Sequence, residues 1–574
     1  MKGTKKYWKG LEQLADNAEF KKHADKEFPE YLPIAGEDGP NRRDFLKMMG
    51  FSVAAVSLAA CETPVKKAIP YVSKPASVDP SVPNYYASTY VSGSDALPIV
   101  VKTREGRPIY VDGNKLSKIS GKGTSAQAQA SVLSLYDRER LEGPMISGSS
   151  VSWDEIDSAI KKDLAAAGGK IAIVSNSIAS PSTLSVIEKF KSVFPADHIM
   201  YDTMSLSGLT EAYEKAFGKK VLPVHEFGKA KTIVSFGADF LGTWPNQTYN
   251  NNEFAKTRRL SDSKKDMSRL YAFESNLSLT GANADYRQPI KASETGAYVA
   301  SLYNAIASKL GQPTVGGAKA ESAILKKAAA DLLASQGKSI VICGSNDAKI
   351  QSIVVAINNL LGSFGSTIDV NKALNTRKGN DQQFDAFVKA LNGGQVAGVI
   401  FINCNPVYDH PLGGQIASGL SKVKLSVSTS DRLDETASLV KYQTPDHHYL
   451  ESWNDFEIVT GNYSLSQPTI KNIFDTRQAQ ESLLTWSGES KSYYDFIQEY
   501  WTENIYPLSS GFSSFISFWD KCLHDGFFEP EATAGDSPQA NVDLGGVSVS
   551  GKSDGLELII YEKNSIGNGA QANN

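Results

Sequence analysis

The chain has 574 residues, of which 41% are hydrophobic and 21% are charged, a composition typical of globular proteins with a sizeable buried core. Its length predicts about three to four domains rather than one. The formal net charge is only -4 and no Lys/Arg-rich run is present, so we expect no nucleic-acid partner.

The cysteine spacing excludes the commonest metal sites. The four cysteines are Cys61, Cys343, Cys404 and Cys522. No C-x-x-C pair occurs, so the usual ligand spacing of iron–sulfur and structural zinc sites is missing. We expect Cys343 and Cys404 to be small apolar fillers at strand ends; a disulfide stays open at this point.

Residues 41–61 carry an export pattern, after an unusually long leader over residues 1–40. An arginine pair, Phe-Leu-Lys and a short apolar run over 48–60 are typical of twin-arginine signals. The apolar run, about 13 residues long, is too short to span a hydrocarbon core as a regular helix. The alternative is a buried helix of the mature fold, and the leader is either a docking arm or a mobile extension. The predicted signal residues are Arg42, Arg43, Phe45, Leu46 and Lys47.

The signal ends in a lipidation-type cysteine. Leu58, Ala59 and Ala60 precede Cys61, as an aliphatic and two small residues do at a lipoprotein processing site. Acylation of Cys61 would hold the protein at a membrane surface without a spanning helix. The alternative is an ordinary Cys61, with the signal cleaved nearby or retained.

The body begins with a hairpin and continues as an α/β protein. After a linker over residues 62–96, strands are predicted at 97–103 and 108–111 around a tight turn. Ser152 then caps a helix, and a second helix is predicted at 182–194. Apolar runs that we expect to be parallel strands, buried on both faces, lie at 170–175, 232–237, 339–344 and 399–403.

These elements predict the fold class α/β, with parallel-sheet domains, a small β-hairpin region and a truncated C-terminal β segment. The expected divisions are a β-rich region at 97–150, α/β domains at 151–335 and 336–445, an irregular and helical insertion at 446–540, and the start of a C-terminal β domain at 541–574.

Polar and small residues follow each predicted parallel strand. In such sheets ligands bind beyond the carboxyl ends of the strands, so these segments could line one crevice. The alternative is that they only make turns. The segments are 175–177, 237–239, 344–346 and 403–406.

An ordered set of segments resembles the molybdopterin oxidoreductases of the dimethyl-sulfoxide-reductase-like group, over most of residues 97–574. The matching segments are 101–108 with 112–114, 135–141, 151–155, 237–241, 280–285, 403–406 and 431–437. Residues 403–406 look like the family's Gly-x-Asn-Pro strand end near the pterin dinucleotide. The resemblance implies that Asn403, Asn405 and Pro406 are vestigial pterin-pocket positions.

Departures from the family pattern indicate an empty site. Active members carry a cysteine cluster for a [4Fe–4S] centre before the hairpin, whereas here only Cys61 precedes it. No cysteine, selenocysteine or aspartate stands convincingly as a molybdenum ligand, and Asn403 replaces a common glycine. We therefore predict no catalytic residue, no metal ligand and no cofactor within these residues.

Within the group, the chain most resembles the large periplasmic subunit of alternative complex III, described more generally as a Tat-translocated molybdopterin oxidoreductase. This resemblance implies a non-catalytic scaffold of a quinol-oxidising respiratory complex on the periplasmic side of the inner membrane. The implied partners are the membrane-complex subunits, an iron–sulfur ferredoxin-like domain on a following or separate chain, and haem c subunits. The chain would then be the front half of a longer or divided protein.

Two other functions stay open. One is an active molybdopterin-dependent oxidoreductase of the sulfur or oxyanion reductase type, and the other a free lipoprotein with a ligand in a leftover pocket. Adjacent His447 and His448 lack an evident third metal ligand, so we interpret them as a solvated polar loop. The aromatic stretch 493–519 is expected to pack as a helical core or partner face.

Overall fold

The computed structural model describes residues 82–92, 95–318, 320–531, 539–549 and 554–571. The leader, the twin-arginine residues, Cys61 and most of the linker therefore lie outside the described part. The chain divides into two compact units, Met1–Pro75 and Ala76–Asn574, and all of the described residues belong to the second. In the described ranges, no helix combines the length and apolarity needed to cross a membrane.

The first element is a three-stranded antiparallel sheet, β1 (Asn84–Ser92), β2 (Asp95–Arg104) and β3 (Arg107–Gly113). The expected hairpin is confirmed, and Glu105 and Gly106 both have positive φ at its turn (53° and 74°), as a two-residue hairpin requires. Helix α4 (Ala126–Ser134) packs on β3 and helps to bury Val101 and Val111.

A seven-stranded sheet in the order β5-β4-β16-β15-β14-β6-β7 forms the larger α/β layer. Its strands β16, β15, β14, β6 and β7 are mutually parallel, and β6 and β14 are buried at every position. This confirms the expectation of parallel strands buried on both faces. The strands are β4 (Met145–Ile146), β5 (Ser149–Ser150), β6 (Ile171–Ser175), β7 (Ala196–Met200), β14 (Gly398–Ile402), β15 (Leu425–Ser428) and β16 (Tyr442–Gln443). Its helices are α5 (Trp153–Ala166), α6 (Pro181–Val193), α13 (Asp381–Asn392), α14 (Pro406–Asp409), α15 (Gly413–Leu420) and α16 (Ala479–Trp486).

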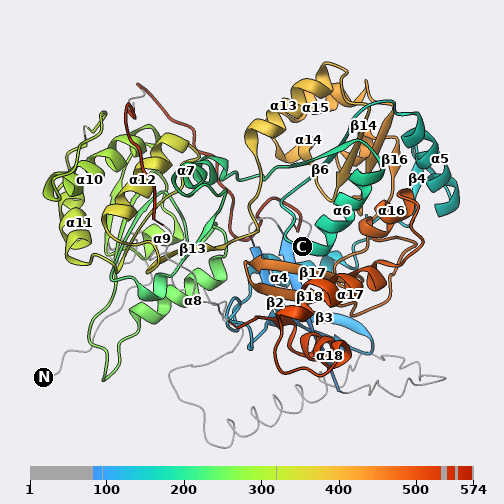
Figure 1. Cartoon of the computed structure of the whole chain (residues 1–574), viewed down its shortest axis with the longest axis horizontal. Coiled ribbons are helices and arrows are strands. Elements are labelled where there is room, and N and C mark those ends of the chain that lie inside the picture. The colour runs from blue at the N-terminus through green and yellow to red at the C-terminus, as the bar shows by residue number, and fades with distance from the viewer. Residues whose placement is uncertain (1–81, 93–94, 319, 532–538, 550–553, 572–574) are drawn as a thin grey trace, which may run out of the picture. The chain divides into compact units, whose positions relative to one another are not determined.

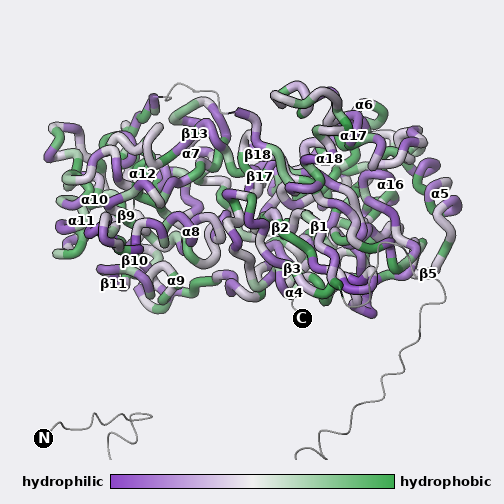
Figure 2. Tube along the Cα trace, turned by 90° about the horizontal axis from the view of Figure 1, so that it is seen from below, coloured by the Kyte–Doolittle hydropathy of each residue, from purple (hydrophilic) through white to green (hydrophobic). Residues whose placement is uncertain are grey.

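A second parallel sheet, in the order β11-β10-β9-β12, forms another α/β layer. Its helices cover both sheet faces and alternate hydrophilic and hydrophobic stretches (Figures 1 and 2). The strands are β9 (Thr232–Phe236), β10 (Arg269–Glu274), β11 (Tyr286–Pro289) and β12 (Ser339–Cys343), with the antiparallel pair β8 (Pro223–His225) and β13 (Ile368–Ala373) beside them. The helices are α7 (Ser207–Phe217), α8 (Gln247–Arg258), α9 (Leu279–Ala282), α10 (Thr295–Lys309), α11 (Ala323–Ala334) and α12 (Ala348–Leu360). Short 3-10 turns lie at Phe227–Lys229, Ala292–Glu294, Ala437–Leu439 and Tyr506–Leu508.

Strand pairing crosses the boundary expected at residue 335. β12 pairs with β9 from the preceding segment, and β14 returns to pair with β6. The second sheet is thus inserted in the chain between two halves of the first.

The segment 446–540 holds more strand than expected. β17 (Asn454–Val459), β18 (Asn462–Ser466) and β19 (Phe527–Phe528) form a three-stranded antiparallel sheet. The aromatic stretch packs as the predicted helical core, in α17 (Tyr493–Asn504) and α18 (Phe515–Asp525), with Trp501 and Phe518 fully buried. The C-terminal β segment forms no strand ladder with the described residues, and Leu556, Leu558 and Ile560 are exposed.

Candidate functional site

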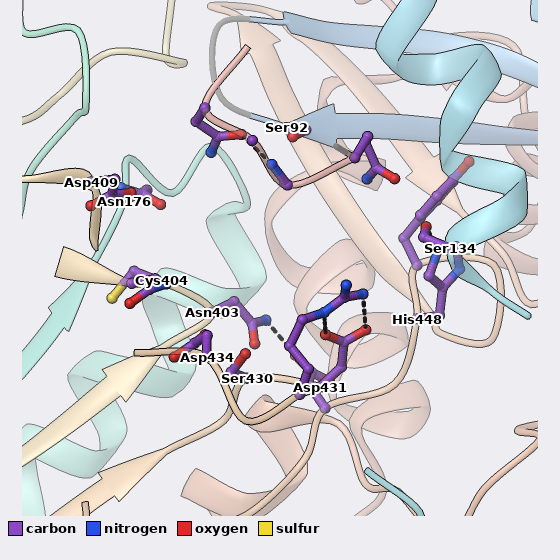
Figure 3. A pocket seen from close by; sticks show the side chains of 18 of the residues that line it. Ser92, Ser134, Asn176, Asn403, Cys404, Asp409, Ser430, Asp431, Asp434 and His448 are labelled. Carbon is purple, nitrogen blue, oxygen red and sulfur yellow. Dashed lines mark hydrogen bonds and ion pairs between the residues drawn. The ribbon is translucent and has the colours of Figure 1, made fainter. Parts of the chain in front are cut away.

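A polar cavity opens at the carboxyl ends of β6, β14 and β15. It has two adjoining lobes of about 550 and 350 Å³ that share Asn403 and Asp446. Of the four polar strand ends predicted to meet, those after β6 and β14 line it, together with the loops after β15 and β16 (Figure 3). The other two, at Gly237 and Gly344, belong to the second sheet. Asn568 and Ala570 line both lobes.

Asn403 closes the end of β14 in a left-handed conformation, with φ of 46°, which asparagine tolerates better than most residues. Its amide nitrogen donates to Asp446 at 2.5 Å, and its amide oxygen accepts from the Thr429 hydroxyl at 2.9 Å. The side chain predicted to intrude at the strand end is thus held by protein partners on both sides.

The other two predicted positions lie on the same turn. Asn405 donates to Glu435 at 2.7 Å and accepts from the backbone and hydroxyl of Thr436. Pro406 is buried and begins α14, where proline needs no hydrogen-bonded N–H. The structure brings Asn403 and Asn405 to the cavity wall, and Pro406 supports the turn behind them.

Carboxylates dominate the larger lobe. The acidic lining residues are Asp409, Asp431, Asp434, Glu435 and Asp446, against the single cation Arg432. Arg432 is itself bound by Asp431 and Asp137. Burial raises the pKa of Asp409 to about 6 and that of Asp446 to about 7, and it also raises the pKa of Asp434.

Internal carboxylates occupy the two helix N-termini that begin at the smaller lobe. Asp455 accepts from the Ser180 and Ser182 hydroxyls, both at 2.7 Å, and from the Ser182 backbone N–H at the start of α6. Trp501 also donates to it at 2.9 Å. Asp446 accepts from the Ala479 N–H at 3.1 Å, at the start of α16. Helix N-termini favour anions, and here carboxyl oxygens of the chain itself accept these N–H groups.

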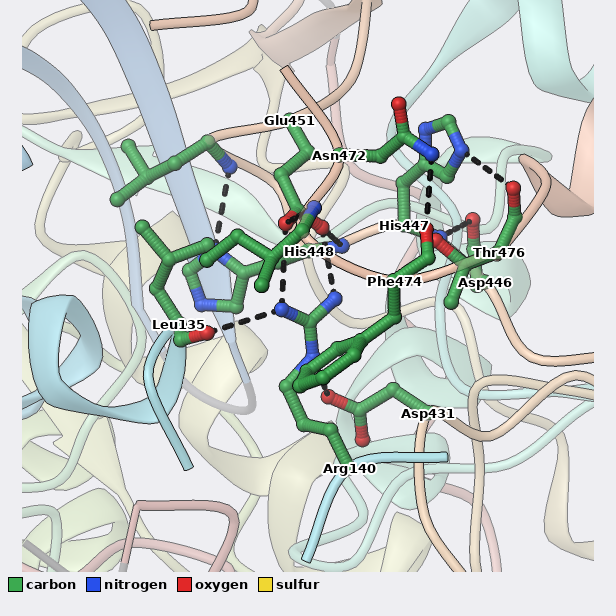
Figure 4. A network of polar contacts seen from close by, with 12 residues as sticks. Leu135, Arg140, Asp431, Asp446, His447, His448, Glu451, Asn472, Phe474 and Thr476 are labelled. Atoms are coloured by element: carbon green, nitrogen blue, oxygen red, sulfur yellow. Dashed lines mark hydrogen bonds and ion pairs between the residues drawn. The ribbon is translucent and has the colours of Figure 1, made fainter. Parts of the chain in front are cut away.

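A buried ion pair lies under the cavity (Figure 4). Arg140 contacts Glu451 at 2.7 Å and both side chains are fully buried. Arg140 also donates to the Leu135 carbonyl at 2.9 Å and lies over the Phe474 ring. Burial alone would raise the pKa of Glu451, but hydrogen bonding to Arg140 outweighs burial, and the pKa is lowered.

The interpretation of His447 and His448 as a solvated loop is wrong. His448 is 8% exposed and its Nε2 contacts the Ser134 hydroxyl at 3.0 Å, while His447 Nε2 donates to the Thr476 carbonyl. Burial lowers the pKa of both imidazoles, that of His448 to about 4. The loop crosses between β16 and the aromatic core, so its polar sequence is paired internally.

The thiols of the described chain are poor ligands. Cys343, Cys404 and Cys522 are free and buried, which agrees with the filler role expected for the first two. Cys404 donates to the Val174 carbonyl at 3.4 Å, and burial raises the pKa of its thiol. Within the ranges that the structure describes, no three His, Cys, Asp or Glu residues are grouped to hold a metal ion.

Sequence reasoning missed Asp446, Asp455, Arg140 and Glu451. Asp446 and Glu451 stand near His447 and His448 in the sequence, and the pattern was interpreted as a solvated polar loop rather than as buried, hydrogen-bonded groups. Arg140 and Glu451 are 311 residues apart, and no local pattern pairs them.

Comparison with solved structures identifies the architecture. Acetylene hydratase from Pelobacter acetylenicus superposes with a TM-score of 0.59 at 11% sequence identity, covering 78% of this chain and 74% of that chain. The chain has the molybdopterin oxidoreductase fold. This confirms the predicted fold class; an identity this low speaks for the fold alone.

Comparison of sequences gives a curated relative, while no protein-family model matches the chain. The chain is 24% identical over 444 residues to the menaquinone reductase molybdopterin-binding-like subunit of Nitratidesulfovibrio vulgaris (strain Hildenborough). The match covers 68% of this chain and 63% of that protein, so it spans less than two thirds of the relative. The chain is thus similar to a molybdopterin oxidoreductase-like protein whose name links it to quinone chemistry.

Proposed function

We propose that the chain is a non-catalytic, cofactor-free subunit of a respiratory quinone-linked complex. More specifically, we propose that this complex is a quinol-oxidising assembly of the alternative complex III type. The chain would scaffold its iron–sulfur electron-transfer partner. The relative named as a subunit of a menaquinone reductase supports the quinone link. The same relative is named a molybdopterin-binding-like subunit, which supports a molybdopterin-enzyme ancestry.

One observation carries the cofactor-free part of the proposal. A pterin dinucleotide is anionic through its phosphates, and phosphates bind most readily at helix N-termini and cationic side chains. Asp455 and Asp446 already fill the N-termini of α6 and α16. The residues at these two helix N-termini therefore do not fit the phosphates of a pterin dinucleotide.

Other groups that line the cavity also argue against a bound pterin or metal. Arg432, the cation of the larger lobe, is held by two carboxylates. The Asn403 amide projects from the strand end where the chain would have to approach a pterin closely. Cys404 is the thiol that lines the cavity, and it donates its proton to the Val174 carbonyl rather than presenting a free thiolate to a metal.

The location and partners belong to the same proposal. Arg42 and Arg43 in a twin-arginine pattern, followed by Cys61, support export and a lipid anchor on the periplasmic side of the inner membrane. A scaffold there would hold an iron–sulfur domain, and haem c subunits, against membrane-embedded subunits.

The test is to isolate the native complex through a tag on this chain and to measure metals and partners together. We expect quinone-reactive membrane subunits and iron in the complex, with molybdenum far below one atom per chain. One molybdenum per chain would overturn the proposal in favour of an active enzyme. Isolation of the chain without respiratory subunits would overturn the scaffold role.

A further inference from the structure

The outer face of the three-stranded sheet carries a row of aromatic and basic side chains. Strand pairing places Tyr85 opposite Lys102, and Lys102 opposite Tyr110, so the three lie on the same face. Tyr85 is 61% exposed and Tyr110 45%. The next row, which includes Val101 and Val111, points into the core.

The hairpin tip extends this row with further cations. Arg104 and Arg107 are paired across the turn and both are exposed, and Ile109 beside them is 49% exposed. Between the two arginines stands Glu105, the one carboxylate of the tip. Across the described residues, no ion pair holds Lys102, Arg104 or Arg107. We name Tyr85, Lys102, Arg104, Arg107, Ile109 and Tyr110 the sheet-face patch.

The patch differs in charge from the chain as a whole. Its three cations lie beside two carboxylates, Glu105 at the turn and Asp112 two residues beyond Tyr110 on the same face, whereas the whole chain has a net charge of -4. Tyrosine presents an apolar ring with a polar tip, the combination that settles at a membrane–water interface. Arginine and lysine beside such rings are attracted to anionic lipid head groups. Figure 2 shows β1, β2 and β3 side by side with α4.

We propose that the sheet-face patch docks the protein onto an anionic lipid membrane surface. The position of the anchor favours lipid over a protein partner, and in this respect the inference rests on the acylation of Cys61 under the proposed function. Cys61 precedes Val82, where the described chain begins, by about 20 residues, a length that spans at most ~75 Å. The first described element after the anchor is β1, which carries Tyr85.

An anchor and a basic patch reinforce one another. A lipoprotein-type cysteine carries a diacylglycerol, whose two acyl chains hold the protein at the membrane; a cationic surface adds a second contact with anionic head groups, which orients the body. Docking through this face would also limit how the body rotates about its tether. The cavity of the seven-stranded sheet shares no residue with the patch.

The test separates the patch from the anchor. Full-length C61S protein, which cannot be acylated, is mixed with vesicles of phosphatidylethanolamine and phosphatidylglycerol (3:1) or of phosphatidylcholine alone, and binding is measured by co-sedimentation. We expect binding to the anionic vesicles only, weakening as salt rises. Adding R104Q and R107Q should weaken it about 25-fold, at about fivefold per removed charge.

Two controls keep the result specific. K161Q with K326Q removes the same net charge from exposed helix positions on α5 and α11 and should leave binding within about twofold. Y85S with Y110S should weaken the binding that persists at high salt, because the rings act through apolar contact. Equal urea midpoints for all variants would establish that each is folded.

Three outcomes would overturn the inference: no binding to anionic vesicles, equal losses in the patch and control variants, or loss of partner subunits from the native complex in R104Q/R107Q. The last would make the patch a protein-docking surface. The molybdenum content and partner set of the unaltered complex test the proposed function separately, so the two failures are distinguishable.

Discussion

At the residue scale, the buried carboxyl of Asp446 makes the free energy of unfolding depend on pH. Burial raises its pKa to about 7, above about 3.9 in an unfolded chain, so the folded state holds a proton that the unfolded state has lost. Its contribution is therefore fully present below pH 4 and is lost as pH rises to 7. We expect the unfolding free energy of wild type, relative to D446N, to fall by up to about 4 kcal/mol from pH 4 to pH 8. Urea titrations across this range measure it; a difference independent of pH would contradict the assignment.

Asp455 gives a second prediction at this scale, because it stands where an external anion would bind. D455A leaves the Ser182 and Trp501 donors unpaired and should cost about 2–4 kcal/mol of stability. It should also open the N-terminus of α6, so that inorganic phosphate raises the urea midpoint of D455A but not of wild type. S192A, at an exposed hydroxyl of α6, is the matched control. A variant as stable as wild type, or indifferent to phosphate, would show that Asp455 is not an internal anion.

Much of the hydrogen bonding around the cavity could not be predicted from the sequence. Asn403 and Asn405 were identifiable because they follow a strongly apolar strand. Asp446 and Asp455 gain their roles only when β16 and β17 meet helices that begin elsewhere in the chain. Their hydrogen-bond partners are up to 275 residues away, so no local pattern could have revealed them.

At the scale of elements, α7 is fixed against the strand-end loop of β12 by a close backbone approach. A Cβ on Gly208 would lie 2.0 Å from the Asn346 carbonyl oxygen, and the Gly208 N–H donates to the Asn346 side chain at 2.8 Å. G208A must displace one of these backbones and should cost about 1–3 kcal/mol. G414A, on α15 with open space around it, should be neutral or slightly stabilising. Equal thermal midpoints for the two variants would contradict this packing.

Strands were predictable where burial on both faces requires an unbroken run of apolar residues. β6, β9, β12 and β14 are apolar at nearly every position and were located to within about a residue or two. β17 and β18 were missed, because their exposure alternates irregularly and polar residues such as Asp455 and Ser464 are buried by hydrogen bonds. The order of strands in each sheet depends on long-range pairing that strand composition does not encode.

At the scale of the whole described unit, the cavity depends on segments joined by buried charges. Arg140 follows the hairpin region and its helix α4, whereas Glu451 follows β16 of the seven-stranded sheet. Arg140 also bonds Leu135, and Glu451 accepts from the Ile473 N–H at 2.9 Å. The pair therefore connects three regions that are far apart in sequence.

Removing only one charge of the Arg140–Glu451 pair should lower the free energy of unfolding strongly. Replacing both residues by apolar ones should not. R140M leaves the Glu451 carboxylate buried without its cation, which costs about 3–5 kcal/mol, whereas R140M with E451L removes both charges and should recover most of that loss. The cycle is completed by E451L and read from urea unfolding of all four proteins, which yields a coupling energy free of the cost of each single truncation. R432M, at a partly exposed arginine that also binds a carboxylate, should lose about 1 kcal/mol or less. If R140M were no worse than R432M, or if the double variant were worse than R140M alone, the pair would not be the connection between the hairpin region and the cavity that its geometry indicates.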